Sequence, residues 1–519
     1  MKAKGTVYLV GAGPGDIGLL TLRGAELLRR ADVVIYDALV NRDLLRLAPV
    51  TAELVYGGKR DKEHPLPQAE LSALLVAKAR EGKCIVRLKG GDPYVFGRGA
   101  EEVEELVAAG IPFEVVPGVS SFVAAPAYAG IPMTHREHAS AFSVLTGHED
   151  PDKPAAALDY GQIARAPGTK VFMMGTRRIG PIAAALLAEG MPATTPVALV
   201  SWATTGRQKS IEGTLGTIES LAERAALPPP SVIVIGDVVR LRHTLNFAEH
   251  RALAGQRVVI TRAAEQAEEL AQPLRELGAE VIQIPVIKIA PPEDRQALMD
   301  AVLGIADYNW IVFTSVNGVA QFFDYFFKAY DDVRAIGNIR FAAVGPATAA
   351  KLQAMHLRVD VMPEEALGKK IAAAMDRFEN VENLKVLLPR AAGANQDLPK
   401  ALEELRAIVD DVPFYQTVPD TDDRTGTGHA LDETGADWVV FTSGSTVQNF
   451  HTRFDLTKLL AKFPQMRLAS IGPETTKALT VLGLKPAVEA AQHTVPGLVA
   501  ALRREVEERH ERKSGAPAK

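Results

Sequence analysis

Residues 7–16 have the sequence VYLVGAGPGD, in which an apolar, β-branched run leads into a glycine turn. A helical pattern of apolar residues follows from Leu20 to Arg30. Glycine lets the backbone adopt positive φ and approach a ligand closely, and Pro14 stiffens the same turn. A strand, a glycine turn and a helix in this order predict an α/β lobe whose first strand ends in a tight glycine turn.

The turn does not complete the dinucleotide fingerprint G-x-G-x-x-G, because Asp16 stands where the last glycine should be. A second predicted strand, Val33 to Tyr36, nevertheless ends in Asp37, as a ribose-binding strand does. Local features therefore leave two interpretations open, a nicotinamide-binding turn and a tight βα turn without a ligand.

Two more loops follow predicted strands in the same way. Residues 87–99 have the sequence RLKGGDPYVFGRG and precede an acidic helical pattern, and residues 115–121 have the sequence VVPGVSS. Both loops fall at the carboxyl ends of strands, where α/β proteins bind their ligands. Taken alone, Ser120 and Ser121 fit a helix N-cap better than a ligand contact.

The composition is that of a globular α/β protein rather than a nucleic-acid-binding or membrane-spanning one. Of 519 residues, 47% are hydrophobic and 23% are charged, and the net charge is −5. No apolar run approaches the roughly 20 residues that span a bilayer, and the N-terminus lacks the features of a signal peptide. With one cysteine, Cys84, we expect a cytoplasmic protein without nucleic-acid or membrane partners.

Strand and helix patterns alternate along the whole chain, and breaks in the pattern suggest its division. A charged stretch and a new strand mark a seam near residues 244–256, and a lesser break falls near 149–155. We therefore expect one half at 1–246, with lobes of about 1–148 and 149–246, and a second half at 255–510. Residues 511–519 are expected to form a disordered tail.

The second half contains an internal repeat. Trp310-Ile311-Val312-Phe313-Thr314-Ser315 recurs 128 residues later as Trp438-Val439-Val440-Phe441-Thr442-Ser443. The strand that begins at Arg257 recurs at Lys385 with the same offset, and Gly345-Pro346 recurs at Gly472-Pro473 with an offset of 127. This repeat predicts two related α/β lobes, and a cleft between such lobes is a common ligand site.

The segments of the first half together resemble the uroporphyrinogen-III C-methyltransferase family over roughly residues 5–245. The resemblance rests on LVGAGPGDIGLLTLRGAELLRRADVVIYDALV, GGKR with His64 and Gln68, RLKGGDPYVFGRGAEE, VVPGVSS, AYAGIPMTHR and PPPSVIVIGDVVRLR. It implies a two-lobed tetrapyrrole methylase fold that holds S-adenosyl-L-methionine between its lobes. The implied cofactor contacts are Pro14, Gly90, Gly91, Asp92, Val95, Ser120, Ser121, Met174 and Ala203. The chain departs from the family pattern at Ala203, where many members have glycine, and around Met174.

The same resemblance places a proton acceptor at Asp37 and a proton donor at Lys59. The substrate carries eight carboxylates, so basic side chains must line the cleft although the chain is acidic. Arg60, Arg98 and Arg136 are the expected substrate contacts, and Arg87, Lys89 and His135 lie in the same loops. A solvated surface charge is the alternative for each of them, and a turn acid is the alternative for Asp37. His64 is expected to order its loop.

The second half resembles uroporphyrinogen-III synthase over roughly residues 255–503. The order of segments carries this resemblance: VVITR, WIVFTSVNGV, AAVGPATAAKL, KVLLPR, FYQTVP, WVVFTSGSTV and ASIGPETTKAL. It implies a two-lobed, pseudo-symmetric α/β fold without a cofactor, with one lobe at about 255–288 and 416–510 and the other at about 289–415. Tyr415 matches the family tyrosine proposed to assist hydroxyl loss, and a half-buried aromatic is the alternative. The expected substrate contacts are Thr314, Ser315, Asn317, Thr442, Ser443 and Thr475.

The two resemblances imply consecutive reactions, from hydroxymethylbilane to uroporphyrinogen III and then, by methylation at C2 and C7, to precorrin-2. We expect no metal, no dehydrogenase or chelatase activity, and a homodimer formed through the first half. Three alternatives stay open: a different precorrin as methyl acceptor, a second half that is a non-catalytic tetrapyrrole sensor, and a nicotinamide oxidoreductase. The sequence does not distinguish a siroheme from a cobalamin pathway, and it is silent on transfer of the intermediate between halves.

Overall fold

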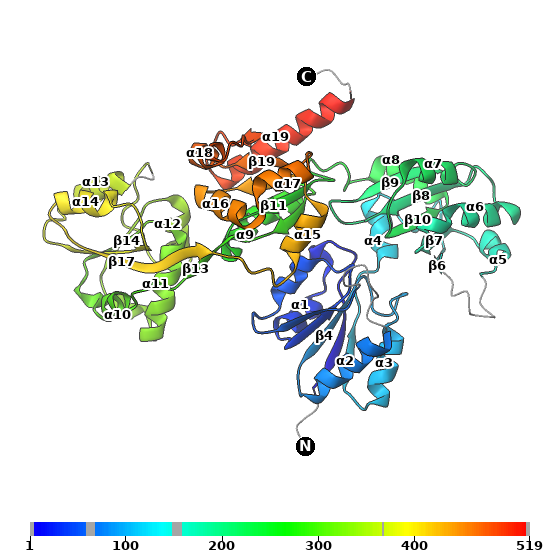
Figure 1. Ribbon diagram of the computed structural model, residues 1–519, viewed down its shortest axis with the longest axis horizontal. Helices are drawn as coiled ribbons and strands as arrows, with labels where there is room; N and C mark the ends of the chain where they lie inside the picture. Colours follow the sequence, from blue (N-terminus) through cyan, green and yellow to red (C-terminus); the bar gives the residue numbers. More distant parts are fainter. Residues whose placement is uncertain (1–4, 59–67, 148–157, 366–367, 515–519) are drawn as a thin grey trace. The chain divides into compact units, whose positions relative to one another are not determined.

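The computed structural model describes residues 5–58, 68–147, 158–365 and 368–514 (Figure 1). Two compact units divide the chain. One comprises Met1–Pro285 with Thr421–Lys519, and the other comprises Val286–Asp420. Within the described ranges, no helix is both long and apolar enough to cross a membrane.

The first sheet is wholly parallel and has the strand order β3-β2-β4-β1-β5. Its strands are β1 (Val7–Gly11), β2 (Val33–Tyr36), β3 (Glu53–Tyr56), β4 (Ile85–Lys89) and β5 (Phe113–Val116). The helical segments that follow these strands are η1 (Ile17–Leu19), α1 (Leu22–Arg29), η2 (Arg42–Leu47), α2 (Gln68–Arg80) and α3 (Gly99–Ala108). Alternate strand residues enter two separate cores, which explains the continuous apolar runs of β1 and β2, whereas β4 also carries Arg87 and Lys89.

The second sheet is mixed, with the order β6-β7-β10-β8-β9. Its strands are β6 (Phe142–Thr146), β7 (Thr169–Met173), β8 (Pro196–Ser201), β9 (Lys209–Thr214) and β10 (Ser231–Ile235). The helices that accompany it are α4 (Ser121–Tyr128), α5 (Tyr160–Arg165), η3 (Thr176–Arg178), α6 (Ile179–Ala188), α7 (Ile218–Ala225), η4 (Asp237–Leu241) and α8 (Arg242–Leu245).

The boundary between these two lobes lies earlier than the sequence suggested. Ala125 and Ala129 of the α4 segment pack against Val171 and Val234 of the second sheet, and β6 pairs with β7. The second lobe therefore begins at Ser121, and the expected boundary at about 148/149 is wrong. The break predicted at 149–155 falls on residues outside the described ranges.

The third sheet has the order β12-β11-β18-β19-β20, and the fourth has the order β13-β17-β16-β14-β15. The third contains β11 (Arg257–Ile260), β12 (Glu280–Gln283), β18 (Trp438–Phe441), β19 (Arg467–Ser470) and β20 (Val488–Glu489), with α9 (Ala264–Glu276), α15 (Thr427–Thr434), α16 (Gly444–Phe454), α17 (Leu456–Lys462), α18 (Pro473–Val481) and α19 (Val495–Ser514). The fourth contains β13 (Ile287–Ala290), β14 (Trp310–Phe313), β15 (Arg340–Ala343), β16 (Lys385–Ala391) and β17 (Ile408–Pro419), with α10 (Gln296–Leu303), η5 (Ile305–Asp307), α11 (Val316–Ala329), η6 (Val333–Ile336), α12 (Pro346–Gln353), α13 (Gly368–Phe378) and α14 (Asp397–Glu404).

Each of the two repeats contributes strands to both of these sheets. The offset of 128 residues relates β11 to β16, β12 to β17 and β14 to β18, and the offset of 127 relates β15 to β19. The orders β12-β11-β18-β19 and β17-β16-β14-β15 are therefore the same order of equivalent strands, all parallel. Each sheet combines the first strand pair of one repeat with the second pair of the other. The compact unit Val286–Asp420 compares with the lobe expected at about 289–415.

One polar residue before each repeated tryptophan joins three strands. The Asn309 amide donates to the Lys385 carbonyl (2.9 Å), the Asn309 side-chain oxygen accepts from the Lys385 amide (2.8 Å), and the Arg340 amide donates to the Asn309 carbonyl (3.0 Å). Asp437 makes the same three bonds, at 2.9 Å and 2.7 Å with Arg257 and at 2.9 Å with Arg467. These bonds fix where the strands start relative to one another, which sets the register of each sheet.

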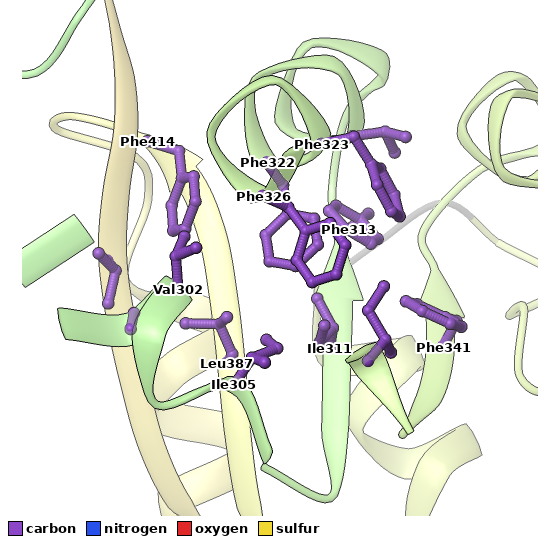
Figure 2. Close-up of a cluster of buried hydrophobic side chains, with 14 of the residues drawn as sticks. Val302, Ile305, Ile311, Phe313, Phe322, Phe323, Phe326, Phe341, Leu387 and Phe414 are labelled. Carbon is purple, nitrogen blue, oxygen red and sulfur yellow. The ribbon is translucent and has the colours of Figure 1, made fainter. Parts of the chain in front are cut away.

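The unit Val286–Asp420 has a core rich in phenylalanine (Figure 2). Phe322 of α11 is fully buried and has ring centroids 5.6 Å from both Phe313 of β14 and Phe414 of β17. The opposite face of the sheet packs Trp310 and Leu388 under α13 and α14. Burial on both faces accounts for the uninterrupted apolar sequence of β14.

The C-terminal segment is helical further than expected. Helix α19 runs to Ser514, and Leu498, Leu502 and Val506 pack into the core beneath the third sheet. The tail predicted as disordered from residue 511 is therefore helical over 511–514, and residues 515–519 lie outside the described ranges.

The hydrogen bonds of Asn309 with two neighbouring strands predict the effect of removing its side chain. Asn309→Ala loses the acceptor for the Lys385 amide, so local opening of β16 should become easier by about 0.5–1.5 kcal/mol. Hydrogen exchange of the peptide that begins β16 measures this change. Asn309→Asp is the matched control because Asp437 does the same work in the other sheet, and equal exchange in all three proteins would contradict the assignment.

Candidate functional site

Three glycine loops of the first lobe meet backbone to backbone. A Cβ atom on Gly118 would lie 2.3 Å from the Gly91 carbonyl oxygen and 2.7 Å from Gly11 Cα, closer than any side chain permits. Gly13 and Gly91 form an isolated antiparallel bridge, with the Gly91 amide donating to the Gly13 carbonyl (2.7 Å). The loops after β1, β4 and β5 are thus brought together at the carboxyl edge of three neighbouring strands, as the sequence predicted for ligand-binding loops.

Asp92 shapes this site through its carboxylate. Oδ2 accepts the Gly118 amide (3.0 Å), and Oδ1 accepts the amides of Tyr94 (2.8 Å) and Val95 (3.2 Å). The side chain therefore ties the β4 loop to the β5 loop and orders the turn that carries Val95. The family resemblance implies a cofactor contact at Asp92, and the geometry adds that its carboxylate holds two loops together.

A loop of the second lobe closes on the first glycine turn. The Asp16 amide donates to Thr204 Oγ1 (3.1 Å), and Tyr128 donates its hydroxyl hydrogen to Asp16 Oδ2 (2.8 Å). A Cβ atom on Gly15 would lie 3.6 Å from the Ala203 carbonyl oxygen. Ala203 thereby lies close to Gly15, the residue that follows Pro14. Asp16, whose presence breaks the dinucleotide fingerprint, is the N-cap of η1 and accepts the Gly18 amide.

Several residues in and beside the predicted cofactor loops have left-handed backbone. Phe96 and Arg98 in the β4 loop, Met174 after β7, and Trp202 and Thr204 beside Ala203 all have positive φ, between 48° and 67°. Such conformations cost non-glycine residues free energy and gather at functional sites. Met174 is 48% exposed at the end of β7.

The two serines of the third loop are positioned differently from a simple cap. Ser120 occupies the N-cap position of α4 but makes no side-chain cap hydrogen bond, and it is 5% exposed. Ser121 is the first residue of the helix. Ser120 therefore occupies the N-cap position of α4, but its hydroxyl accepts no capping hydrogen bond.

A buried charge cluster lies behind Asp37. Arg87, Lys89 and Glu102 have exposed fractions of 2%, 3% and 0%. Glu102 accepts from Arg87 Nε (3.2 Å) and Lys89 Nζ (2.7 Å), and Arg87 Nη2 reaches Asp37 Oδ1 at 2.5 Å. Asp37 is the one member with a substantially exposed side chain, at 31%. Arg87 and Lys89, considered as substrate contacts from sequence, serve this internal cluster instead.

Burial and charge oppose each other within the cluster. Burial alone would raise the pKa of Glu102, but the nearby Arg87 and Lys89 charges outweigh it and lower that pKa below its usual range. Burial and the Arg87 charge lower the pKa of Lys89, although Glu102 opposes them. Glu102 is thus held ionised at neutral pH. Because folding lowers its pKa, it contributes stability above the ordinary glutamate range, and that contribution is lost as acid protonates the folded protein.

Sequence reasoning did not select Glu102. Its signal was the pair of glutamates in GRGAEE, of which Glu101 is exposed and Glu102 faces β4. A buried arginine and lysine on one strand require a buried anion nearby, and the next helix is where such an anion can lie. That inference needed the burial of Arg87 and Lys89, which the sequence left open.

Some of the residues predicted to contact the substrate are exposed, and others fall outside the residues that the structure describes. Lys59, Arg60 and His64 fall in the undescribed range 59–67. Arg98 is exposed and pairs with Glu101, and Arg136 is exposed. His135, Glu137 and His138 offer ligand atoms within 4.8 Å of one another, but the Glu137 amide donates to His135 Nδ1. The prediction that the chain needs no metal stays a prediction.

The synthase candidates divide into surface, cap and core positions. Tyr415 is 6% exposed, its ring belongs to the phenylalanine core, and its hydroxyl lies 3.0 Å from Ser315 Oγ. Ser315 caps α11 by accepting the Gly318 amide, and its repeat partner Ser443 caps α16 in a capping box. Thr475 is 3% exposed, which speaks against a contact with a substrate carboxylate. Thr314, Thr442 and Asn317 are partly exposed beside these caps.

Two family models match the chain, one in each half of the sequence. The model described as Tetrapyrrole (Corrin/Porphyrin) Methylases matches residues 6–219. The model described as Uroporphyrinogen-III synthase HemD matches residues 268–500.

Relatives match the whole chain or its first half. The porphyrin biosynthesis protein HemD of Ruminiclostridium josui is 39% identical over 447 residues, which are 86% of this chain and 88% of the relative. The S-adenosyl-L-methionine-dependent uroporphyrinogen III methyltransferase of Methanosarcina barkeri is 49% identical over 241 residues, 46% of this chain and 94% of the relative. The solved uroporphyrin-III C-methyltransferase of Thermus thermophilus, complexed with S-adenyl homocysteine, is 41% identical, covers 46% of this chain and 100% of its own, and has a TM-score of 0.40.

The three-loop site on a parallel sheet and the exchanged α/β repeat define a chain of two enzyme folds in tandem. More particularly, the chain belongs to the family in which a tetrapyrrole methylase is followed by a HemD-type uroporphyrinogen-III synthase domain, and it acts in tetrapyrrole biosynthesis.

The contact between glycine loops predicts a strong effect of one added methyl group. Gly118→Ala would push backbone against backbone, so we expect the first half to lose about 3 kcal/mol or more and its three loops to exchange amide hydrogen faster. Thermal unfolding and hydrogen exchange over residues 88–95 and 115–121 measure this. Gly216→Ala is the control, because its Cβ would meet its neighbours no closer than 3.4 Å. Similar behaviour of the two variants would contradict the described contact.

Proposed function

We propose that the chain performs two consecutive reactions on tetrapyrroles. Its second half closes hydroxymethylbilane to uroporphyrinogen III with inversion of ring D. Its first half then transfers methyl groups from S-adenosyl-L-methionine to C2 and C7, which gives precorrin-2. The observation that carries the methyltransferase proposal is the meeting of the glycine loops around Gly91, next to an anchored carboxylate at Asp37.

The geometry of the loops fits a nucleoside-type cofactor. A Cβ on Gly90 would meet only Leu39 Cβ, at 3.4 Å, so the backbone of this loop faces open space. Ser120 offers a hydroxyl that caps no helix, and the exposed Met174 side chain lies at the end of β7. When bound, S-adenosyl-L-methionine supplies an electrophilic methyl group on a sulfonium. Backbone groups of Gly90 and Gly91 would hold it, with Pro14, Val95 and Ala203 closing the site.

Asp37 supplies a negative charge where the methylated ring becomes positive. Attack by a pyrrole carbon leaves a cationic ring that must lose a proton, and a fixed carboxylate stabilises that cation and accepts the proton. Arg87 holds Oδ1, and among the described residues no donor is assigned to Oδ2. We propose Asp37 as the acceptor, with Lys59 as donor and with Arg60, Arg98 and Arg136 binding substrate carboxylates.

For the synthase half we propose Tyr415 as the group that assists loss of the terminal hydroxyl. A phenol donates a hydrogen bond to a departing oxygen, and Ser315 holds the Tyr415 hydroxyl 3.0 Å away. Thr314, Asn317, Thr442 and Ser443 lie at or beside the N-termini of α11 and α16, where backbone amides favour carboxylates. This half is proposed to work without a cofactor. The strong burial of Tyr415 is the observation that keeps a non-catalytic tetrapyrrole-sensing domain as the second candidate.

Product analysis tests both reactions in the intact chain. With hydroxymethylbilane alone we expect uroporphyrinogen III, and with S-adenosyl-L-methionine added we expect a product heavier by two methyl groups. Isomer-resolving chromatography with mass measurement identifies both. Only isomer I, the product of spontaneous closure, would overturn the synthase proposal in favour of the sensor. Isomer III that stays unmethylated would overturn the substrate proposed for the first half.

A second experiment isolates the Tyr415 hydroxyl. Tyr415→Phe keeps the ring in the phenylalanine core and should slow ring closure about 10²-fold, the lower end of general acid catalysis. Ser315→Ala is the matched control, since it removes the partner of the hydroxyl and leaves the phenol. A Tyr415→Phe protein that closes the ring at the normal rate would show that the tyrosine is a core residue only.

A further inference from the structure

Glu102 joins two other elements to the helix that carries it. It lies on α3 with an exposed fraction of 0%, and it accepts from Arg87 and Lys89 of β4. It also accepts from Gln68 Nε2 at the first turn of α2 (3.1 Å). Two elements are therefore fixed to α3 through one carboxylate.

The guanidinium of Arg87 transmits this anchoring to Asp37. Its Nε and Nη2 atoms donate to Glu102 at 3.2 Å, and Nη2 also donates to Asp37 Oδ1 at 2.5 Å. Its Nη1 atom faces the carbonyl oxygens of Ile35 and Leu88, each at 3.4 Å. A planar group held on all its edges has one orientation, so the position of the Asp37 carboxylate is set by Glu102.

Charge balance alone does not explain this arrangement. Asp37 and Glu102 balance Arg87 and Lys89, yet packed apolar side chains commonly stabilise a core as well as buried ions do. The cluster differs from an internal salt bridge because one member, Asp37, reaches solvent at the edge of the sheet where the glycine loops meet. A buried set of charges that ends in one accessible carboxylate is suited to presenting that carboxylate.

We infer that Glu102 is a positioning residue of the methyltransferase site, which acts through Arg87 to fix the Asp37 carboxylate against the methylated ring. This inference rests on the proposed function of Asp37. It assigns to Glu102 no contact with substrate or cofactor. The lowered pKa of Glu102 agrees with a permanent anion in this place.

Glu102→Gln in the full chain tests the inference. The amide keeps the shape but removes a negative charge beside Arg87 and Lys89, so the cluster becomes net positive. We expect the maximal rate of methyl transfer to fall about 10²-fold, as for a displaced catalytic group. We also expect the acid limb of the rate–pH profile to move to lower pH, because excess positive charge keeps Asp37 ionised. A change in folded fraction alone would lower the rate without moving that limb.

Three comparisons separate positioning from folding. Glu104→Gln makes the same charge change at an exposed position of α3 and should leave the profile unchanged. Ring closure by the second half of the same protein reports whether the chain is intact. Lys89→Met with Glu102→Gln restores zero net charge, so it should recover thermal stability while methyl transfer stays slow. Recovery of both would overturn the inference, because Glu102 would then only neutralise buried cations.

Asp37→Asn distinguishes a failure of this inference from a failure of the role proposed for Asp37, on which the inference rests. If Asp37→Asn still transfers methyl groups normally, the role proposed for Asp37 fails, and the inference about Glu102 fails with it. If Asp37→Asn is inactive while Glu102→Gln has the normal rate and profile, the proposed function stands and Glu102 has no positioning role.

Discussion

The absence of side chains at Gly11 and Gly118, which lie against the Gly91 carbonyl, is the constraint on which the first half depends. Their backbones approach so closely that a methyl group on Gly118 would lie 2.3 Å from a carbonyl oxygen. This contact joins the loops after β4, β1 and β5 into one surface. Asp92 then secures two of the loops with hydrogen bonds, and Thr204 brings the second lobe against the first turn. The glycines of the sequence are thus explained by contact between loops as much as by contact with a ligand.

The charge cluster adds chemistry to that surface. β2 and β4 are neighbours, so Asp37 at the end of one lies beside Arg87 of the other. Burying Arg87 and Lys89 on β4 requires a buried anion, and Glu102 supplies it from α3. The sheet order, the burial of its centre and the helix that covers it therefore determine together where one accessible carboxylate is held.

Much of this could be predicted from sequence, and the rest could not for identifiable reasons. The glycine loops, the alternation of strands and helices, and the repeat of 128 residues were visible because each is a local pattern. The lobe boundary at Ser121 was missed because α4 packs on a sheet whose strands come later in the chain. Glu102 was missed because its importance depends on the burial of two residues on another element. Ser315 and Ser443 were recognised as loop hydroxyls, while their capping bonds became visible only in the structure.

In the second half, the strands of the two repeats are exchanged between two sheets. Each sheet takes strands from both repeats, so Asn309 and Asp437 must each join strands far apart in sequence. Tyr415 lies on β17, the counterpart of β12, where the second repeat continues as one strand and the first is divided into β12 and β13. The position of the tyrosine is therefore a local departure from the repeat, and it places a hydroxyl beside a helix cap.

A crystal structure of the full chain with S-adenosylhomocysteine would test the central claim most directly. The account predicts that the ligand lies against the backbone of Gly90 and Gly91, with the pairs Glu102–Arg87 and Arg87–Asp37 intact and the Asp37 carboxylate facing the ligand sulfur across the substrate space. A ligand bound away from the three glycine loops, or an Asp37 carboxylate turned away from it, would contradict the account.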